Sequence, residues 1–221
     1  MVLDLDPGLV EATLLTSVRM LAFLLIAPPF AHRTVPGQVR LNIRLALALA
    51  AAPRVSPGYA PVDTATFVGH LLGEALAGAA LGTLVLVVFS AVEQAGHHID
   101  LFGGFSLGML FDTHVHGAPF SRLFGLAAVV LMFTSDAYQL VVLGLVRSYD
   151  AVPLGVLVDL PGESLVAVLT GSFLAGLQIA GPLLVVLLLA DVGLGLVNRV
   201  APQLNAFVLG FPLKILLTLT L

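Results

Sequence analysis

Apolar residues gather in six runs that are separated by clusters of proline, glycine and charge. The runs cover residues 9–28, 39–53, 75–92, 123–146, 164–190 and 203–221. Two of them, 75–92 and 164–190, contain no charged residue at all. A membrane-spanning helix needs about 20 mostly apolar residues, and the alternation typical of a membrane barrel does not recur. The pattern therefore predicts an all-α, polytopic membrane-type protein, with five or six long or broken helices arranged as hairpins.

The other runs carry polar residues. Run 9–28 contains Glu11 and Arg19, and run 123–146 contains Asp136, so each is predicted to be a span with a polar interruption. Run 39–53 is short and begins beside arginines, whereas run 203–221 contains Pro212 and Lys214. Both runs are therefore predicted to be half-helices or a broken hairpin, the second because proline disrupts a helix interior. No linker is long enough to divide domains, which predicts a single domain over residues 1–221.

Composition strengthens the membrane prediction and excludes other classes. Apolar residues make up 59% of the chain and charged residues 10%, too few polar groups to cover a globule in water. Nine Lys and Arg against thirteen Asp and Glu give a net charge of −4, which excludes a nucleic-acid-binding domain. The absence of cysteine excludes disulfides and a cysteine nucleophile. The N-terminus is acidic where a secretory signal is basic, so we expect the first run to be retained.

Arginine positions predict the orientation. If the N-terminus lies outside and each run crosses once, five arginines face the inside and two face the outside, as positive-inside topology requires. The inner set is Arg33, Arg40, Arg44, Arg122 and Arg199, and the outer set is Arg54 and Arg147. Small residues at four-residue spacing predict close helix packing, although membrane helices are also simply rich in glycine. They are Gly69, Gly73 and Ala77, followed by Gly78 and Gly82.

Two motifs suggest chemistry. Gly104, Ser106 and Gly108 match the G-x-S-x-G turn of serine hydrolases, but that turn needs a preceding strand, so we favour a glycine-rich loop. Glu93, His97 and Asp100 share one helical face, close in sequence to three further histidines. These are His98, His114 and His116. These residues could form a metal or proton site. Alternatively, they form the polar end of a helix where the chain leaves the apolar layer.

Three acidic residues, Glu74, Asp136 and Asp191, lie within or beside apolar runs and are candidate functional groups. Each could serve a proton relay, or could pair with Arg19, Arg199 or a neighbouring subunit. We favour pairing, because no second carboxylate lies beside any of them at helical spacing. Charges at membrane depth are costly, about 2.5–3.5 kcal/mol each on insertion scales. We therefore expect four basic residues to face protein or an aqueous vestibule: Arg40, Arg44, Arg199 and Lys214.

Several segments, taken together, resemble the FliR family of flagellar type III secretion export-gate subunits, in the wider superfamily that includes the SctT proteins. Ala27-Pro-Pro-Phe30 and the basic stretch after it match the N-terminal part, and Glu93-Gln-Ala-Gly96 matches the centre. The stretch from Asn198 to Lys214 resembles the ending of the family. Its characteristic positions are Asn198, Pro202, Asn205, Gly210 and Pro212.

The resemblance implies a non-enzymatic subunit, without cofactor or metal, that assembles with FliP-like and FliQ-like membrane proteins in the bacterial inner membrane at the flagellar basal body. It also implies that the loop 103–117 projects into the export channel as a plug. The sequence suits that role, because glycine supplies backbone freedom and large apolar side chains can seal a pore. The candidate plug residues are Gly103, Gly104, Phe105, Leu107, Gly108, Met109, Leu110, Phe111 and Asp112.

Two alternatives remain open. The chain could serve an injectisome of the same superfamily, or it could be a stand-alone transporter that uses Glu93, His97 and Asp100. The family also commonly continues by another helix or more beyond the position of Leu221, and commonly has proline where Thr113 follows Asp112. We predict that six polar residues lie within the membrane or at contacts of the assembly: Glu74, Glu93, Asp136, Asp191, Arg199 and Lys214.

Overall fold

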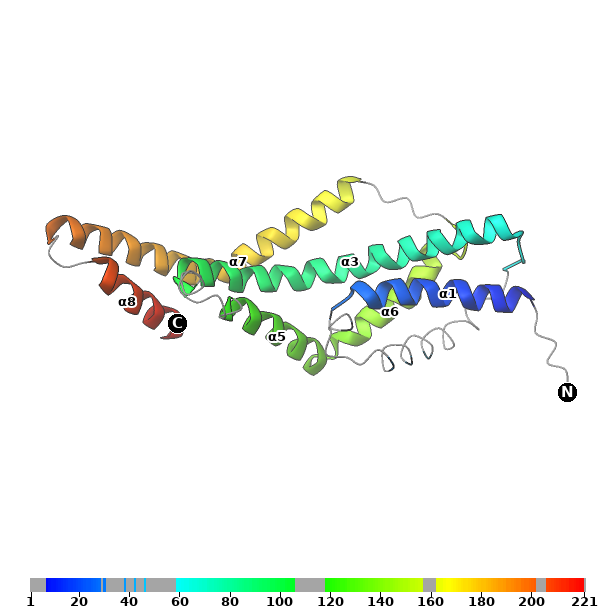
Figure 1. The fold of residues 1–221 in the computed structure, drawn as a ribbon, viewed down its shortest axis with the longest axis horizontal. Helices are drawn as coiled ribbons and strands as arrows, with labels where there is room; N and C mark the ends of the chain where they lie inside the picture. Colours follow the sequence, from blue (N-terminus) through cyan, green and yellow to red (C-terminus); the bar gives the residue numbers. More distant parts are fainter. Residues whose placement is uncertain are drawn as a thin grey trace. The chain divides into compact units, whose positions relative to one another are not determined.

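The computed structural model describes residues 7–28, 30, 38, 42, 46, 59–105, 118–156, 162–201 and 206–220. Within these ranges all regular structure is helical, which confirms the all-α prediction (Figure 1). The helices are α1 (Pro7–Ile26), α3 (Thr64–Phe102), α5 (Pro119–Thr134), α6 (Ala137–Ala151), α7 (Gly162–Val200) and α8 (Ala206–Thr220).

Three of the helices are long and apolar enough to cross a membrane. They are Pro7–Ile26, Thr64–Phe102 and the Val166–Val200 part of α7, with mean hydropathies of 1.9, 2.3 and 2.3. These segments confirm the prediction of a polytopic membrane-type protein. Both α3 and α7 are 39 residues long and extend well beyond the charge-free runs. Charged residues end an apolar run, but they do not interrupt backbone hydrogen bonding, so the helices continue past them.

The run 123–146, predicted as a span with a polar interruption at Asp136, is broken at that residue. The run divides into α5 and α6, which meet at an angle of 78°. Asp136, at the start of α6, has a left-handed backbone with φ of 57°. A single left-handed residue cannot continue a right-handed helix, and a short polar side chain tolerates that conformation better than most.

The C-terminal run forms one 15-residue helix, α8, which is not among the helices long enough to span a membrane and so fits the predicted half-helix; the proline does not break it. Pro212 lies inside a continuous helix, α8, and Pro182 lies in the same way inside α7. Proline removes one backbone hydrogen bond, and the remaining turns keep theirs, so neither helix ends there. Of the run 39–53, only Asn42 and Ala46 belong to the described residues, and its predicted half-helix otherwise lies outside them.

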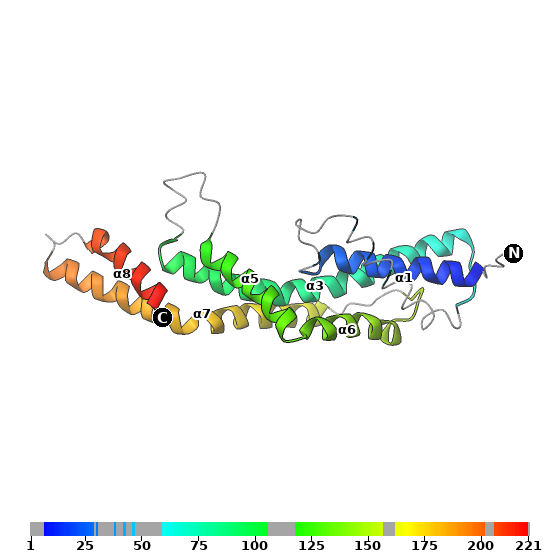
Figure 2. The same ribbon diagram turned by 90° about the horizontal axis from the view of Figure 1, so that it is seen from below.

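The first compact unit comprises residues 1–87 and 131–165. Its core joins α1, the first part of α3, and α6, and Figure 2 shows α1 running alongside α3. The buried residues are Met20, Phe23, Leu24, Ala27, Leu145 and Tyr149. Met20, Phe23 and Leu24 of α1, and Ala27 directly after it, recur at three- and four-residue intervals, so one face of this helix is buried.

The second unit comprises residues 88–130 and 166–221. Its core brings Ala95 and Ile99 of α3 against Ala180 of α7, with Phe120 and Phe124 of α5 packed around them. The small side chains allow the helices to approach closely. The prediction that the two units form one domain stays a prediction.

Glycines mark the tightest helix contacts in each unit. A Cβ atom on Gly78 would overlap the backbone of Arg19, and one on Gly82 would lie 3.0 Å from the carbonyl oxygen of Phe23. In the second unit, a Cβ on Gly176 would lie 2.7 Å from the carbonyl oxygen of Ala91. Gly69, by contrast, has open space around it. The close packing expected from glycine spacing is therefore confirmed at Gly78 and Gly82.

Candidate functional site: polar contacts of the two units

A buried ion pair joins α1 and α3. Arg19 of α1 and Glu74 of α3 are both almost completely buried, at 0% and 1% side-chain exposure. The Nε of Arg19 donates to Oε2 of Glu74 at 2.6 Å, and Nη2 donates to Oε1 at 3.0 Å. This two-point geometry is the strongest form of an arginine–carboxylate contact. The pairing of Glu74 with Arg19 is one of those that the sequence allowed.

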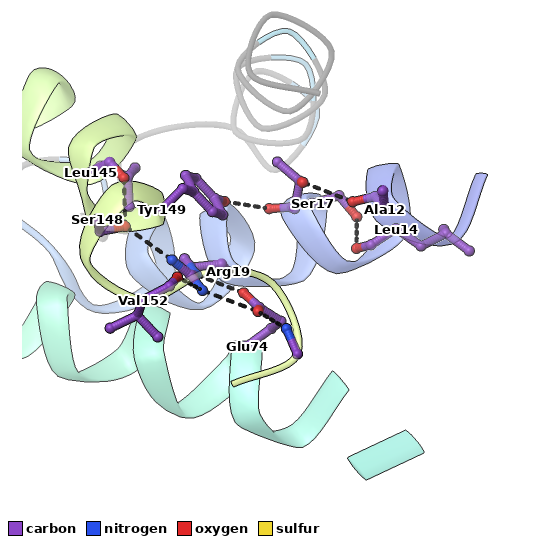
Figure 3. A network of polar contacts seen from close by, with 11 residues as sticks. Ala12, Leu14, Ser17, Arg19, Glu74, Leu145, Ser148, Tyr149 and Val152 are labelled. Atoms are coloured by element: carbon purple, nitrogen blue, oxygen red, sulfur yellow. Dashed lines mark hydrogen bonds and ion pairs between the residues drawn. The ribbon is translucent and has the colours of Figure 1, made fainter. Parts of the chain in front are cut away.

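Groups from α6 and the turn after it complete the surroundings of the pair (Figure 3). Arg19 donates through Nη1 to the hydroxyl of Ser148 at 3.2 Å and through Nη2 to the carbonyl of Val152 at 2.9 Å. The guanidinium lies 4.1 Å from the ring centre of Tyr149, which favours the cation. The Tyr149 hydroxyl in turn donates to the carbonyl of Thr16 at 3.2 Å. These partners could not be expected from the sequence pattern, because they lie more than 120 residues from Arg19.

This arrangement is suited to holding helices together rather than to moving protons. Oε1 of Glu74 also accepts the backbone N–H of Gly155 at 3.2 Å, so both carboxylate oxygens have donors. Gly155 has φ of 80°, and a Cβ on it would lie 2.8 Å from the ring of His70. A buried charge that is paired and fully hydrogen-bonded favours one packing of its neighbours. The network thus fixes α1, α3 and α6 in one arrangement.

A second polar group lies near the start of α3. The Tyr59 hydroxyl is 3.4 Å from Nδ1 of His70, and the carboxylate of Glu11 accepts the backbone N–H of Val62 at 3.4 Å. Burial and the nearby Glu11 carboxylate raise the pKa of Tyr59. These contacts connect the segment before α3 to α1.

Asp63 caps the N-terminus of α3. Its carboxylate accepts the Thr66 hydroxyl at 2.6 Å and the backbone N–H groups of Ala65 and Thr66 at 3.2 and 3.3 Å. Hydrogen bonds from Thr66 lower the pKa of Asp63. The sequence carried a signal for this cap, an aspartate directly before a helical run with threonine three residues later.

The predicted face of Glu93, His97 and Asp100 is divided between two environments. Glu93 and His97 are exposed, whereas Asp100 is fully buried. Oδ1 and Oδ2 of Asp100 accept the backbone N–H groups of Phe120 and Ser121 at 3.0 and 2.9 Å. Asp100 therefore caps α5 from another helix. The part of the chain that the structure describes contains no group of three residues able to hold a metal.

The remaining acidic candidates lie elsewhere. Oδ1 of Asp191 in α7 is 2.6 Å from the ammonium of Lys214 in α8. Lys214 was not among the partners expected for Asp191 from the sequence. Asp136 is exposed, and its side chain forms no capping hydrogen bond at α6. Arg199 is exposed near the end of α7. The structure thus pairs two of the three acidic candidates, Glu74 and Asp191.

Only the beginning of the predicted plug belongs to the described residues. Gly103 continues the hydrogen bonding of α3 through its N–H to Ile99 at 2.8 Å, and Gly104 turns the chain with φ of 84°. The ring of Phe105 then packs edge-on against Phe120, 5.1 Å between centres. The predicted plug residues from Leu107 to Asp112 lie outside the described residues, as do Ser106, His114 and His116.

The C-terminal motif positions are partly described. Asn198 is exposed on α7, Gly210 is buried beneath the Leu194 side chain, and Pro212 is exposed on α8. Pro202 and Asn205 lie outside the described residues. A Cβ at position 210 would be 3.1 Å from Cδ1 of Leu194, so a small residue at this point suits the contact of α8 with α7.

Comparison with known proteins gives a consistent result. The family model for bacterial export proteins, family 1, matches residues 10–221. The flagellar biosynthetic protein FliR of Escherichia coli is 32% identical over 208 residues, 92% of this chain and 80% of that protein. FliR of Bacillus subtilis is 30% identical over 97% of this chain and 84% of that protein. The Yop proteins translocation protein T of Yersinia pestis is 28% identical over 89% and 78%. The chain therefore belongs to family 1 of the bacterial export proteins, the family to which its resemblance to FliR pointed.

Proposed function

We propose that this chain is a subunit of the flagellar protein-export gate in the bacterial inner membrane, at the basal body. In this proposal it forms the channel together with FliP-like and FliQ-like subunits, and exported flagellar proteins pass through unfolded. The family match over residues 10–221 and the identity to two FliR proteins support a flagellar export role.

The observation that best supports assembly with other proteins is the length of the two long apolar helices. At 1.5 Å per residue, the 39 residues of α3 or α7 extend about 58 Å, whereas the hydrocarbon layer is about 30 Å thick. Large apolar side chains are exposed at both ends of α7, as at Val166 (63%) and Val200 (85%). Only 17% of the most apolar window of α7 is buried. Lipid would cover about half of such a helix, so we expect other protein subunits to cover much of the remaining apolar surface.

This proposal is tested by expressing the full chain with and without FliP-like and FliQ-like subunits from the same bacterium. We expect the chain alone to be degraded or aggregated and the co-expressed chain to be recovered in one complex. A stable chain that transports ions in liposomes without partners would instead support the transporter alternative.

We further propose that the loop 103–117 closes the channel. The left-handed turn at Gly104 and the contact of Phe105 with Phe120 support a structured start to this loop, and its sequence is unusually apolar for a connection. The remaining plug residues, Leu107, Gly108, Met109, Leu110, Phe111 and Asp112, enter the proposal by resemblance. Deletion of the loop in otherwise intact assemblies should raise ion conductance while secretion continues.

Substitution of the glycines should have the opposite effect. Valine at Gly103, Gly104 and Gly108 should keep conductance low and reduce secretion, because β-branched residues disfavour the positive φ of Gly104 and a Cβ on Gly103 would lie 2.7 Å from the carbonyl oxygen of Ile99. Gly171→Val, at an open position on α7, is the control for a valine replacing glycine. Unchanged conductance in the deletion variant, with normal assembly, would exclude the plug.

An injectisome role is the second candidate, since the Yersinia translocation protein T is 28% identical. The two roles are separated by complementation. We expect the gene to restore motility to a strain that lacks FliR and to leave injectisome secretion unrestored in a strain that lacks translocation protein T.

A further inference from the structure

The first unit contains a groove between α3 and α6 with a volume of about 300 Å³. Arg19 contributes to it from α1, and most of its other lining is small or aliphatic. The aliphatic and small lining residues are Ala77, Ala80, Leu81, Leu84, Gly144, Ala151 and Val152. Because Gly144 has no atom within 4 Å of its Cβ position, the groove is open at that point of α6.

The polar lining of the groove comes from Arg19, Ser148 and Arg147. The first two are already bonded to each other within the buried network. Arg147 is exposed and has no hydrogen bond or ion pair to any of the residues that the structure describes. One guanidinium with five N–H donors is therefore available beside an otherwise apolar groove.

Arg147 also lies at a change in polarity along α6. From Ala137 to Val146 the helix carries no charge, and Arg147 and Asp150 follow within its last five residues. In a membrane helix, the first charged residues after an apolar run lie at the interface, where lipid phosphates are found. The groove thus combines an apolar wall with a cation at interface level.

We propose that this groove binds one phospholipid molecule, with an acyl chain along Leu81, Leu84 and Gly144 and the phosphate on Arg147. Arginine binds phosphate oxygens through paired N–H donors, so charge and shape are both complementary. A partner helix that packs an apolar face on the groove would leave the Arg147 guanidinium without an anion.

The test uses a phospholipid with a photoreactive group in its acyl chain, added to the full chain purified from membranes in the assembly that it forms. After illumination, modified peptides are mapped by mass spectrometry. We expect modification to concentrate on α3 around Leu81 and Leu84 and on α6 around Gly144. Uniform modification of exposed apolar positions along α3 and α7 would indicate boundary lipid only and would overturn the proposal.

Two variants and two matched controls sharpen the result. Arg147→Gln should lower modification of the groove about tenfold, whereas Arg122→Gln, at an exposed arginine of α5, should leave it unchanged. Gly144→Leu fills the groove and should abolish modification there, whereas Gly171→Leu, at an open glycine of α7, should not. Equal modification in Arg147→Gln and wild type, or no modification of the groove in the wild-type assembly, would overturn the proposal. Each variant is compared at equal recovery of the folded assembly.

Discussion

At the scale of single residues, the most consequential contact is the ion pair between Arg19 and Glu74. Either residue without the other would destabilise the fold, because burial of an unpaired charge in an apolar bundle is energetically unfavourable. Together they neutralise each other's charge, and they form hydrogen bonds with Ser148 of α6 and with Val152 and Gly155 in the turn after it. The pair therefore behaves as one structural element whose two halves cannot be lost separately.

The first prediction follows from that coupling. Glu74→Leu or Arg19→Met alone should destabilise the first unit by about 3–5 kcal/mol, because each leaves one buried charge unpaired. The double variant Arg19→Met with Glu74→Leu should recover most of that loss. Protease resistance and thermal denaturation of the purified assembly measure the effect. Additive losses in the double variant would contradict the coupling.

Glycine packing gives a second prediction with an internal control. Gly78→Ala should destabilise the contact of α3 with α1 by about 1–3 kcal/mol, since the new Cβ would overlap the backbone of Arg19. Gly69→Ala, on the same helix but in open space, should be neutral or stabilising by about 0.5–1 kcal/mol. Melting temperatures of the two variants provide the comparison, and equal shifts would show that the close contact is absent.

The cap at Asp63 predicts a pH dependence at the start of α3. Hydrogen bonds lower the pKa of Asp63 in the folded protein below its ordinary value of 3.8. Its contribution to stability is thus complete above that value and is lost as the pH falls through the lower, folded-state pKa. Hydrogen exchange of the first turn of α3 should accelerate in this acid range. In Asp63→Asn, which keeps a capping oxygen but cannot ionise, the acceleration should disappear.

At the scale of helices, ends and bends are determined by contacts between segments. The sequence indicated an interruption of run 123–146 at Asp136, but the left-handed backbone of this residue and the 78° angle between α5 and α6 appear only in the structure. Conversely, prolines 182 and 212 lie inside helices that continue through them. The cap of α5 comes from Asp100, which lies 20 residues from the N–H groups that it accepts.

This distant cap leads to the prediction for α5. Asp100→Ala removes the acceptor for two backbone N–H groups and should cost about 0.5–2 kcal/mol, the usual range for a lost helix cap. Asp100→Asn keeps one acceptor and should lie between alanine and wild type. Hydrogen exchange at Phe120 and Ser121 reports the change directly. His97→Ala, at an exposed position of the same helix, should leave this exchange unaffected, and a similar effect of both alanines would argue against a capping role.

At the scale of the whole molecule, exposed apolar surface dominates. Charge introduced at the ends of α7, as Val166→Glu or Leu196→Glu, should prevent recovery of the chain with partner subunits, because both positions are exposed and the helix exceeds the membrane thickness. Glu163→Gln, an exposed change in the first turn of α7, is the control and should assemble normally. Co-purification measures the outcome. Normal assembly of both glutamate variants would show that lipid or water, not protein, covers these ends.

The sequence by itself determined the class of the protein, its long helices and its family. Apolar length and low charge are local properties, and a helix satisfies its own backbone, so α1, α3 and α7 could be predicted before any contact was known. Glu74 was recognised as a residue in need of a partner for the same reason, since burial of charge is costly wherever it occurs.

Only the tertiary structure decided which groups meet. Arg19 contacts Glu74, Tyr149 and Val152. Asp191 pairs with Lys214, and Asp100 accepts hydrogen bonds from the start of α5. The spacing of residues along one helix does not predict any of these pairs. Contacts between helices depend instead on the crossing geometry and on the side chains that fill the space between the helices. The face of Glu93, His97 and Asp100 is divided for the same reason: the three residues share a helix face, but Asp100 accepts two backbone N–H groups at the start of α5, which have no acceptor within their own helix.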